Sequence, residues 1–518
     1  MEDKNLKLQE MYTAAVQNQQ KGNFVEAENL YKKILKEMPT HVNTLSNLGT
    51  VYLQINDIEK ATFYLQDALK IDPNSLIANS NLGVVFNHSS EYDKALKCFQ
   101  KVINIDPRNA DAHNNLGINY RQLGEYDLAK KYLYKAIEIN PNHVNAYNNL
   151  GTLLSHLGEN DKAIEALNKA LEINPNFSKA QNNLSSTYLN DPKHIGKSIS
   201  ASYQALTTHY KISNVYNNNV PLFRLKHDVG QAEYLKNKKH NLMGISEFIK
   251  TGKEILSRDE NKETESNFNK NISLKDAEVQ SLLPFSKIQH IHNAKKIESG
   301  ALNPKNDWKQ IESKYLNSST QIIYIDDFLS EEAIKELREF SLASKVWIHH
   351  KPNKYLGAYS ENGFTSPLHL QLRTDLQKKL PNLFGKYNSG KFWGYKYDTN
   401  LGGGIGIHAD FAYLNLNFWI TPDEYNNDKN KGGLKVYDAA APEDWSFSKY
   451  NTNAKEIYKF LNEKKANCEN IPYKYNRAVL FNSAYFHETD EIDFKEGYES
   501  RRINITYLFG NRTIKKLK

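Results

Sequence analysis

The sequence has few of the features that mark secreted, membrane or nucleic-acid-binding proteins. It contains only two cysteines, Cys98 and Cys468, so a disulfide framework is not expected and a reducing cytoplasm is the expected location. No run approaches 18 apolar residues, and the charged start of the chain lacks the apolar stretch of a signal peptide, so no membrane span or secretion is expected. The net charge of +7 is small for 518 residues and is not clustered, which gives no reason to expect a nucleic-acid partner.

The first two hundred residues repeat with a period of 34. Small residues let paired helices pack closely, and a proline ends a helix. Glycine keeps the period at Gly49, Gly83, Gly117 and Gly151, alanine at Ala27, Ala61, Ala95, Ala129 and Ala163, and proline at Pro39, Pro73, Pro107, Pro141 and Pro175. The pattern, as in NNLGINYRQLGEYDLAKKYLYKAIEINP, resembles the tetratricopeptide repeat. It predicts an all-α solenoid over residues 1–205, with five full repeats and a degenerate sixth from Ser178.

An asparagine occupies the same position in the first helix of five successive repeats. These residues are Asn47, Asn81, Asn115, Asn149 and Asn183. They resemble the asparagine ladder in the groove of the O-linked N-acetylglucosamine transferase superhelix, which implies that a peptide or protein partner binds there. A carboxamide offers a donor and an acceptor to a passing peptide unit. The alternatives are that the asparagines bond one repeat to the next, or that they reflect duplication in an Asn-rich chain.

Residues 206–318 lose the period and become strongly polar. We interpret this segment as a helical spacer that wraps the domain after it. The pair His227–Asp228 and the pair His290 and His292 have the residue types of metal ligands but no further ligand nearby. Surface or capping roles are therefore favoured over a metal site.

From about residue 319 the pattern changes to helices followed by short strands. A helix is predicted after the N-cap Ser330, and a second over residues 368–384. Six aromatic and β-branched segments follow: 391–397, 404–410, 413–420, 433–438, 478–483 and 503–509. They predict a jelly-roll or double-stranded β-helix over residues 319–518. The long excursion from Asp438 to Asn470, with a helix at 453–465, is predicted to form a lid over the substrate.

Three residues of this region have the types and order of a metal site. His408 and Asp410 follow a glycine-rich turn (Gly402–Gly404), and His487 follows the strand at 478–483. A His-x-Asp pair alone is expected by chance in a chain with 16 histidines. Two histidines and one carboxylate on one side of Fe(II) leave two positions for a chelating 2-oxo acid and one for dioxygen. Zn²⁺ on the same ligands, or ordinary buried histidines, are the alternatives.

In this order the elements resemble the 2-oxoglutarate/Fe(II)-dependent oxygenase superfamily, over about Ile322 to Gly510. The resemblance implies that His408, Asp410 and His487 bind the iron. In the nucleic-acid dealkylase branch the last strand reads Arg-x-Asn-hydrophobic-Thr, which residues 502–506 match. Residues 417–451 closely resemble the C-terminal domain of bacterial oxygenases joined to tetratricopeptide arrays.

The resemblance also implies contacts to 2-oxoglutarate from Arg502, Asn504 and Tyr397. Strand alternation places Arg502 and Asn504 on one face, so Arg502 rather than Arg501 is predicted to bind the far carboxylate through two parallel hydrogen bonds. The chain departs from the dealkylase branch at Tyr395, where that branch has asparagine, and this weakens any inference about the substrate. Two asparagines, Asn415 and Asn417, either line the pocket or belong to an edge strand.

The expected function is hydroxylation of a peptide or protein side chain delivered by the solenoid, with Fe(II), the co-substrate 2-oxoglutarate and ascorbate as a reductant. Peptidyl prolyl and aspartyl/asparaginyl hydroxylases combine helical repeats with this barrel, which is an analogy of architecture only. Two alternatives stay open. One is hydroxylation of a small molecule or glycan, with the repeats docking a partner protein, and the other is a non-catalytic scaffold.

Overall fold

The chain divides into two compact units, Met1–Phe177 and Ser178–Lys518. A computed structural model describes residues 2–191, 193–212, 216–258, 261, 270–351, 355–387, 390–398, 404–410, 412–445 and 447–510. Within these ranges no helix is long and apolar enough to cross a membrane. Each unit is described separately below.

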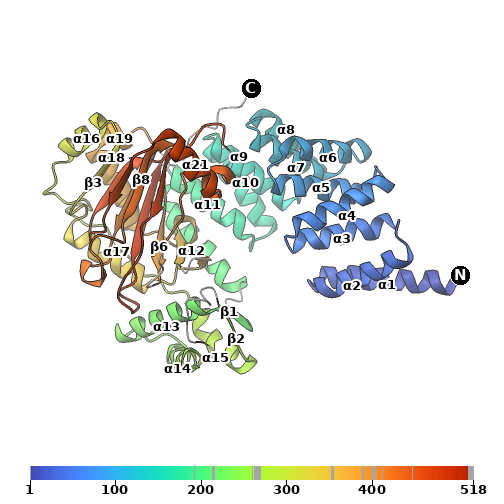
Figure 1. The fold of residues 1–518 in the computed structure, drawn as a ribbon, viewed down its shortest axis with the longest axis horizontal. Helices are drawn as coiled ribbons and strands as arrows, with labels where there is room; N and C mark the ends of the chain where they lie inside the picture. The colour runs from blue at the N-terminus through green and yellow to red at the C-terminus, as the bar shows by residue number, and fades with distance from the viewer. Residues whose placement is uncertain are drawn as a thin grey trace. The chain divides into compact units, whose positions relative to one another are not determined.

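The first unit consists of five consecutive helix pairs (Figure 1). The helices are α1 (Glu2–Gln20), α2 (Phe24–Glu37), α3 (Val42–Gln54), α4 (Ile58–Ile71), α5 (Leu76–His88), α6 (Tyr92–Ile105), α7 (Ala110–Gln122), α8 (Tyr126–Ile139), α9 (Val144–His156) and α10 (Asn160–Ile173). The second helix of each pair ends two residues before one of the periodic prolines, where the chain can no longer continue a helix. The predicted all-α repeat array is confirmed over these residues.

The periodic glycines mark the closest helix contacts inside a repeat. A Cβ atom added to Gly117 would lie 2.6 Å from Cγ of Leu133, and Gly49 and Gly151 have the same relation to Leu65 and Leu167. Any larger side chain would therefore push the two helices apart. The period seen in the sequence thus follows from the packing of each repeat.

The helices of the sixth, degenerate repeat belong to the second compact unit. These are α11 (Ser178–Asn190) and α12 (Ile195–Ile212). The hydroxyl of Ser202 on α12 donates to the carbonyl of Ser360 at 2.6 Å and accepts from the amide of Gly363 at 2.6 Å. Arg373 donates to the carbonyl of Leu189 on α11 at 2.5 Å. The last repeat is therefore fixed to the residues around the C-terminal sheets.

The second unit continues with four helices and a small two-stranded sheet. These elements are β1 (Asn219–Pro221), α13 (Leu222–Asn237), α14 (Ile245–Leu256), β2 (Asn271–Ser273), α15 (Asp276–Ser286) and α16 (Trp308–Asn317). Although α13 has a polar sequence, most of its residues are buried, and buried charges are paired: Nε of Arg224 lies 2.8 Å from a carboxylate oxygen of Asp228. The surface or capping role predicted for His227 is wrong. Its side chain is completely buried and its Nδ1 lies 2.8 Å from the other oxygen of Asp228.

The remaining elements form two antiparallel sheets with flanking helices (Figure 1). They are β3 (Ile322–Ile325), α17 (Glu331–Ala343), β4 (His349–Lys351), β5 (Tyr355–Tyr359), η3 (Ser360–Asn362), α18 (Pro367–Lys379), α19 (Pro381–Phe384), β6 (Gly390–Tyr397), β7 (Leu414–Trp419), η4 (Asp423–Tyr425), β8 (Leu434–Ala440), α20 (Phe447–Thr452), α21 (Ala454–Lys464), β9 (Cys468–Ile471), β10 (Ala478–Asn482), β11 (Tyr485–Thr489) and β12 (Ile503–Phe509). The predicted N-cap Ser330 is confirmed, since its hydroxyl accepts from the amide of Ala333.

The large sheet has the order β3-β10-β7-β12-β6-β5-β4, and the small one the order β11-β8-β9. From β6 onward the chain passes repeatedly between them: β6 and β7 lie in the large sheet, β8 and β9 in the small one, β10 in the large, β11 in the small and β12 in the large. The large sheet has an outer face of apolar side chains, such as Leu416 and Ile505, in one core with α17 and α18. Its inner face, which includes Trp419 and Phe481, packs with residues of the small sheet.

Most of the predicted strands are present, with one correction. Residues 404–410 are predicted to form a strand, but only His408 makes a β-bridge, to His487. Asn415 and Asn417 lie on β7, between β10 and β12, so the edge-strand alternative for them is wrong. Of the glycine-rich turn at 402–404, Gly402 and Gly403 lie outside the described residues.

Candidate metal centre

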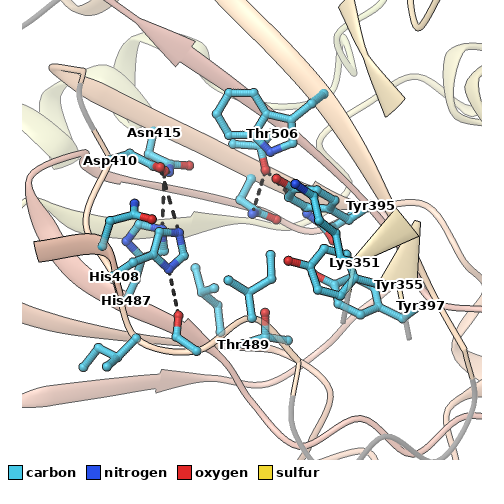
Figure 2. Close-up of a pocket in the computed structure, with 18 of the residues that line it drawn as sticks. Lys351, Tyr355, Tyr395, Tyr397, His408, Asp410, Asn415, His487, Thr489 and Thr506 are labelled. Atoms are coloured by element: carbon cyan, nitrogen blue, oxygen red, sulfur yellow. Dashed lines mark hydrogen bonds and ion pairs between the residues drawn. The ribbon is translucent and has the colours of Figure 1, made fainter. Parts of the chain in front are cut away.

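Two short segments bring His408, Asp410 and His487 together at one end of a cavity (Figure 2). His408 and His487 exchange backbone hydrogen bonds of 3.0 and 2.8 Å, which fixes the two segments side by side. Nε2 of His408 lies 3.9 Å from one oxygen of Asp410, and Nε2 of His487 lies 3.5 Å from the other. Because alternate residues of an extended chain share a face, His408 and Asp410 point the same way. The three side chains form a facial set of two nitrogens and one carboxylate.

The other polar atoms of the three side chains are held by neighbours. Nδ1 of His408 lies 2.8 Å from the carbonyl of Gly406, and Nδ1 of His487 lies 2.9 Å from the carbonyl of Tyr485. A carbonyl can only accept, so each Nδ1 carries the proton and each Nε2 is left as a lone-pair donor. Asn415 donates to a carboxylate oxygen of Asp410 at 2.7 Å. This is the arrangement that orients histidine and carboxylate ligands around a metal ion.

His408 and Asp410 are held in the protonation states that bind metals. Burial lowers the pKa of His408 to about 4, and the nearby His487 acts in the same direction, so the His408 ring is neutral near pH 7. For Asp410, burial alone would favour the protonated form. The interactions with His487 and His408 and the hydrogen bond from Asn415 outweigh it, and they lower the pKa of the carboxyl group.

The cavity has a volume of about 370 Å³ and extends from the three ligands to an aromatic wall. In Figure 2 the ligands and Asn415 lie at one end, and Lys351, Tyr355, Tyr395 and Tyr397 gather at the other. The inner face of the large sheet also contributes Asn417, Arg502, Asn504 and Thr506 to the lining. The predicted metal and co-substrate residues therefore all line one cavity.

Arg502 is the buried cation of this cavity. Its Nε donates to the carbonyl of Gly432 at 2.7 Å, and its terminal nitrogens reach the carbonyl of Gly433 at 3.3 Å and Oδ1 of Asn504 at 3.2 Å. The guanidinium carbon lies 4.9 Å from the ring centre of Tyr397. Within the described part of the chain no carboxylate forms an ion pair with Arg502, although its side chain is only 2% exposed; Asp490 attracts it from farther away and itself pairs with Lys435. A buried cation without a carboxylate in direct contact indicates a site for an anion.

The neighbouring Arg501 has a different environment. It forms an ion pair of 3.1 Å with Asp398 and does not line the cavity. Side chains of adjacent strand residues point to opposite faces, which separates the two arginines. The geometry therefore favours Arg502 over Arg501 as the predicted contact of a co-substrate carboxylate.

Several residues that line the cavity were not predicted from the sequence as site residues. Lys351 and Tyr355 come from the hairpin of β4 and β5, Trp393 from β6, and Thr489 from β11. The hairpin escapes prediction because its strands are short and lie at the edge of the sheet. The period-two alternation along residues 393–397 is the one signal that could have placed Trp393 and Tyr395 beside Tyr397.

The asparagine ladder is engaged in contacts between repeats. The side-chain amide of Asn47 donates to the Tyr12 hydroxyl at 2.9 Å, and that of Asn81 donates to the Thr50 hydroxyl at 2.7 Å. The amide of Asn149 donates to Asn114 at 2.8 Å, whereas Asn115 accepts a weaker bond from Asn114 at 3.4 Å. All five ladder side chains, Asn183 included, are half-buried. Three of them thus hold neighbouring repeats together, as one alternative anticipated.

The N-terminal region also matches known proteins in sequence. Two models of the tetratricopeptide repeat family match the chain, one at residues 19–80 and the other at residues 74–142 and 108–176. Among curated proteins, none matches the chain.

Solved structures of repeat proteins cover about a third of the chain. The crystal structure of MamA is 32% identical over 32% of this chain and 96% of its own, with a TM-score of 0.28. YrrB, described as a TPR protein with an unusual peptide-binding site, is 24% identical over 34% of this chain and 91% of its own, with a TM-score of 0.28. A thermophilic TPR protein of Thermus thermophilus is 23% identical over 35% of this chain and 99% of its own, with a TM-score of 0.32.

The stacked helix pairs and the periodic residues define the first unit as a helical repeat solenoid. The family matches over residues 19–176 identify these helix pairs as tetratricopeptide repeats.

Proposed function

We propose that the C-terminal unit is an Fe(II)- and 2-oxoglutarate-dependent dioxygenase that hydroxylates a peptide or protein side chain recruited by the repeats. One observation carries the proposal: the facial set of His408, Asp410 and His487 shares a cavity with the unpaired, buried cation Arg502. A metal that must also bind a chelating dicarboxylate needs both features in one cavity.

The strand order supports a double-stranded β-helix. Strands β6, β7, β10 and β12 are adjacent in the large sheet, while β8, β9 and β11 form the small one. The bridge of His408 to His487 adds the ligand segment to the edge of the small sheet. Four adjacent strands of the seven-stranded sheet and four segments of the other layer, with the chain passing repeatedly between them, are the arrangement expected of this fold. We therefore assign the jelly-roll architecture as part of the proposal.

The residues present fit an iron ion and 2-oxoglutarate. The Nε2 atoms and the carboxylate supply the donors of a two-histidine, one-carboxylate site, and Arg502 supplies the counter-charge for the far carboxylate of the co-substrate. Bound together, Fe(II) and 2-oxoglutarate would supply the oxidising power to insert one oxygen atom of O₂ into a C–H bond, as the 2-oxo acid becomes succinate and CO₂. Zn²⁺ would fit the same ligands, but it gives no role to Arg502.

The chain's own residues would bind and orient the reactants. Asn504 accepts from Arg502 and donates to the Thr506 hydroxyl at 3.4 Å, which holds the guanidinium in a fixed plane. The ring of Tyr397 lies against the same guanidinium and is itself buried, so this end of the cavity excludes water. Exclusion of water strengthens the attraction between Arg502 and a carboxylate.

A peptide substrate is favoured by the repeat unit. Its first helices are nearly free of charge: α3, α5, α7 and α9 together carry only Asp111 and Arg121 among Asp, Glu, Lys and Arg. A neutral surface rich in carboxamides suits the peptide backbone, which is polar and uncharged. A small molecule or glycan as substrate, with the repeats docking a partner protein, is the second candidate. The unassigned surface of Lys351, Tyr355 and Trp393 in the cavity is compatible with it.

Binding of the co-substrate tests the proposal. Under anaerobic conditions, protein loaded with Fe(II) should develop a visible charge-transfer absorption on addition of 2-oxoglutarate. Arg502→Met should bind Mn²⁺ as the wild type does but bind 2-oxoglutarate about 100-fold more weakly, because a charge-assisted bidentate contact is lost. Lys351→Met, which removes the other cation of the cavity, is the matched control and should change this affinity little. A wild-type protein that binds Mn²⁺ but no 2-oxoglutarate would favour the scaffold alternative.

A further inference from the structure

The two segments that carry the ligands have an outer face as well as an inner one. His408 and Asp410 line the cavity, whereas Ala409 between them does not and points away from it. Ile407 lies at the edge of the cavity and packs with Ala409 in one apolar cluster. On β11, Phe486 precedes His487 and also points outward. Ile407, Ala409 and Phe486 are at most 3% exposed, so something covers them.

The covering element is residues 441–466 between β8 and β9, here called the insertion. It contains α20 and α21. Its side chains Tyr450, Ile457 and Leu461 form one apolar cluster with Ile407, Ala409 and Phe486. Ile457 is completely buried although it lies on a short helix of a long excursion. The insertion thus packs against the outer side of the two segments that carry the metal ligands. The sequence predicts this region only as a lid over the substrate.

Hydrogen bonds also connect the insertion to the two segments that carry the metal ligands. The amide of Ala409, the residue between His408 and Asp410, donates to the carbonyl of Tyr450 at 3.2 Å. The side chain of Asn451 donates back to the carbonyl of Ala409 at 3.4 Å. On the other segment, the hydroxyl of Tyr458 on α21 donates to a carboxylate oxygen of Glu488 at 2.6 Å, next to His487.

We propose that the insertion is a positioning element of the metal centre: it holds the ligand-bearing segments in register from behind and so sets the affinity for the metal. The inference rests on the proposed metal site. Ala409 and Glu488 are direct chain neighbours of the ligands. Contacts that hold these two residues therefore also limit the backbone positions from which His408, Asp410 and His487 extend. Outer contacts of this kind typically contribute about 10–100-fold to metal affinity.

The insertion also reaches the cavity itself. Asn451, Thr452 and Ala454 line it near the ligands. A molecule in the cavity would therefore touch the same turn that binds Ala409.

The ends of the insertion allow a clean excision. The amide of Asn467 donates to one carboxylate oxygen of Asp438 at 2.7 Å, its side-chain amide donates to the other at 2.8 Å, and the amide of Asp438 donates to the Asn467 carbonyl at 3.0 Å. Residues 441–465 can thus be replaced by Gly-Asn-Gly while the pairing of β8 with β9 is kept. Two point variants accompany the excision: Tyr458→Phe, which removes one hydroxyl, and Ile457→Ala, with Ile457→Val as its conservative rescue.

The experiment measures Mn²⁺ affinity by calorimetry and the visible spectrum of the Co²⁺-loaded protein at saturation. We expect Mn²⁺ to bind about tenfold more weakly to Ile457→Ala and to the excised protein, and a few-fold more weakly to Tyr458→Phe. We also expect an altered Co²⁺ spectrum, which a loss of stability alone would not give, and its recovery in Ile457→Val. Lys459→Ala, an exposed position on the same helix, is the control and should match the wild type.

Two results would overturn the inference, one by excluding the role of the insertion and the other by excluding the metal centre. Wild-type Mn²⁺ affinity and an unchanged Co²⁺ spectrum in folded Tyr458→Phe and Ile457→Ala would show that the insertion does not position the ligands. Failure of the wild type itself to bind Mn²⁺ or Co²⁺ would instead overturn the metal centre, and this inference with it.

Discussion

The two units of this chain are built on opposite principles. In the repeat unit the main contacts are local, because each helix packs on the next and each repeat copies the one before. In the C-terminal unit the decisive contacts are remote. His408 pairs with His487, Arg502 with Gly432, and Arg373 with Leu189. Local repetition gives an extended surface for binding, while remote pairing brings a few reactive groups into one cavity.

This difference makes the units separately measurable. All five tryptophans lie in the second unit, at positions 308, 347, 393, 419 and 445. Tryptophan fluorescence therefore reports unfolding of that unit alone, whereas far-ultraviolet circular dichroism also reports the helices of the repeats. If the units fold independently, a change in one leaves the signal of the other unaltered.

The largest expected effect is on the metal. We predict that His487→Ala weakens Mn²⁺ binding by roughly a thousandfold, because one of three ligands is lost along with a buried partner of Asp410. Calorimetry measures the affinity, and His156→Ala in the repeat unit is the control. Equal Mn²⁺ binding by wild type and His487→Ala would show that His487 is not a metal ligand. The proposed metal centre would then no longer distinguish the C-terminal unit from the repeats.

A second, smaller effect is the loss of stability of the C-terminal unit at acidic pH. Burial lowers the pKa of His369 from 6.5 to about 3. Between those two values the unfolded chain takes up a proton that the folded chain does not, so the free energy of unfolding falls as the pH falls. The loss is about 1.4 kcal/mol per pH unit.

His369→Phe should lack this loss. The imidazole stacks on Phe392 with ring centres 5.3 Å apart, so a phenyl ring suits the site. Between pH 7 and pH 4 we expect the variant to lose about 3 kcal/mol less than the wild type, measured by denaturant titration of tryptophan fluorescence. Parallel losses in both proteins would mean that His369 does not set the acid sensitivity of this unit.

The smallest effect concerns the repeat unit. Asn119 on α7 is completely buried, and neither polar atom of its side chain has a partner within the described residues. The equivalent positions of neighbouring repeats are Val85 and Leu153. We predict that Asn119→Leu stabilises the repeats by about 1–2 kcal/mol, because an unsatisfied amide leaves the core.

The gain should appear in circular dichroism and not in tryptophan fluorescence. Asn115→Leu, at a half-buried position of the same helix, should give no comparable increase. A lower melting temperature of Asn119→Leu would indicate that the amide has a structural role in the repeat.

The two units also differ in how much of their structure the sequence predicts. The solenoid could be predicted because period, proline and glycine all record one local packing pattern. The metal-site residues could be chosen from residue type and order, and the choice of Arg502 over Arg501 from alternation along one strand. Their roles remain predictions.

What the sequence concealed depends on remote partners. The burial of α13 was missed, because it depends on contacts such as the hydrogen bond from Arg224 to the carbonyl of Trp347 at 2.6 Å, which the sequence does not indicate. The contact of the insertion with Ala409 was missed as well, because packing between distant segments leaves no periodic trace. The ladder asparagines were recognised, but their bonds between repeats depend on positions such as Thr50 that no simple pattern distinguishes.

The central claim is tested most directly by succinate formation. Purified protein with Fe(II), ascorbate and O₂ should convert 2-oxoglutarate to succinate slowly even without substrate, and faster when a lysate supplies one. Asp410→Ala, which removes the carboxylate ligand, should reduce this rate to the background of free Fe(II). A wild-type rate no higher than that of Asp410→Ala, with lysate present, would contradict the account.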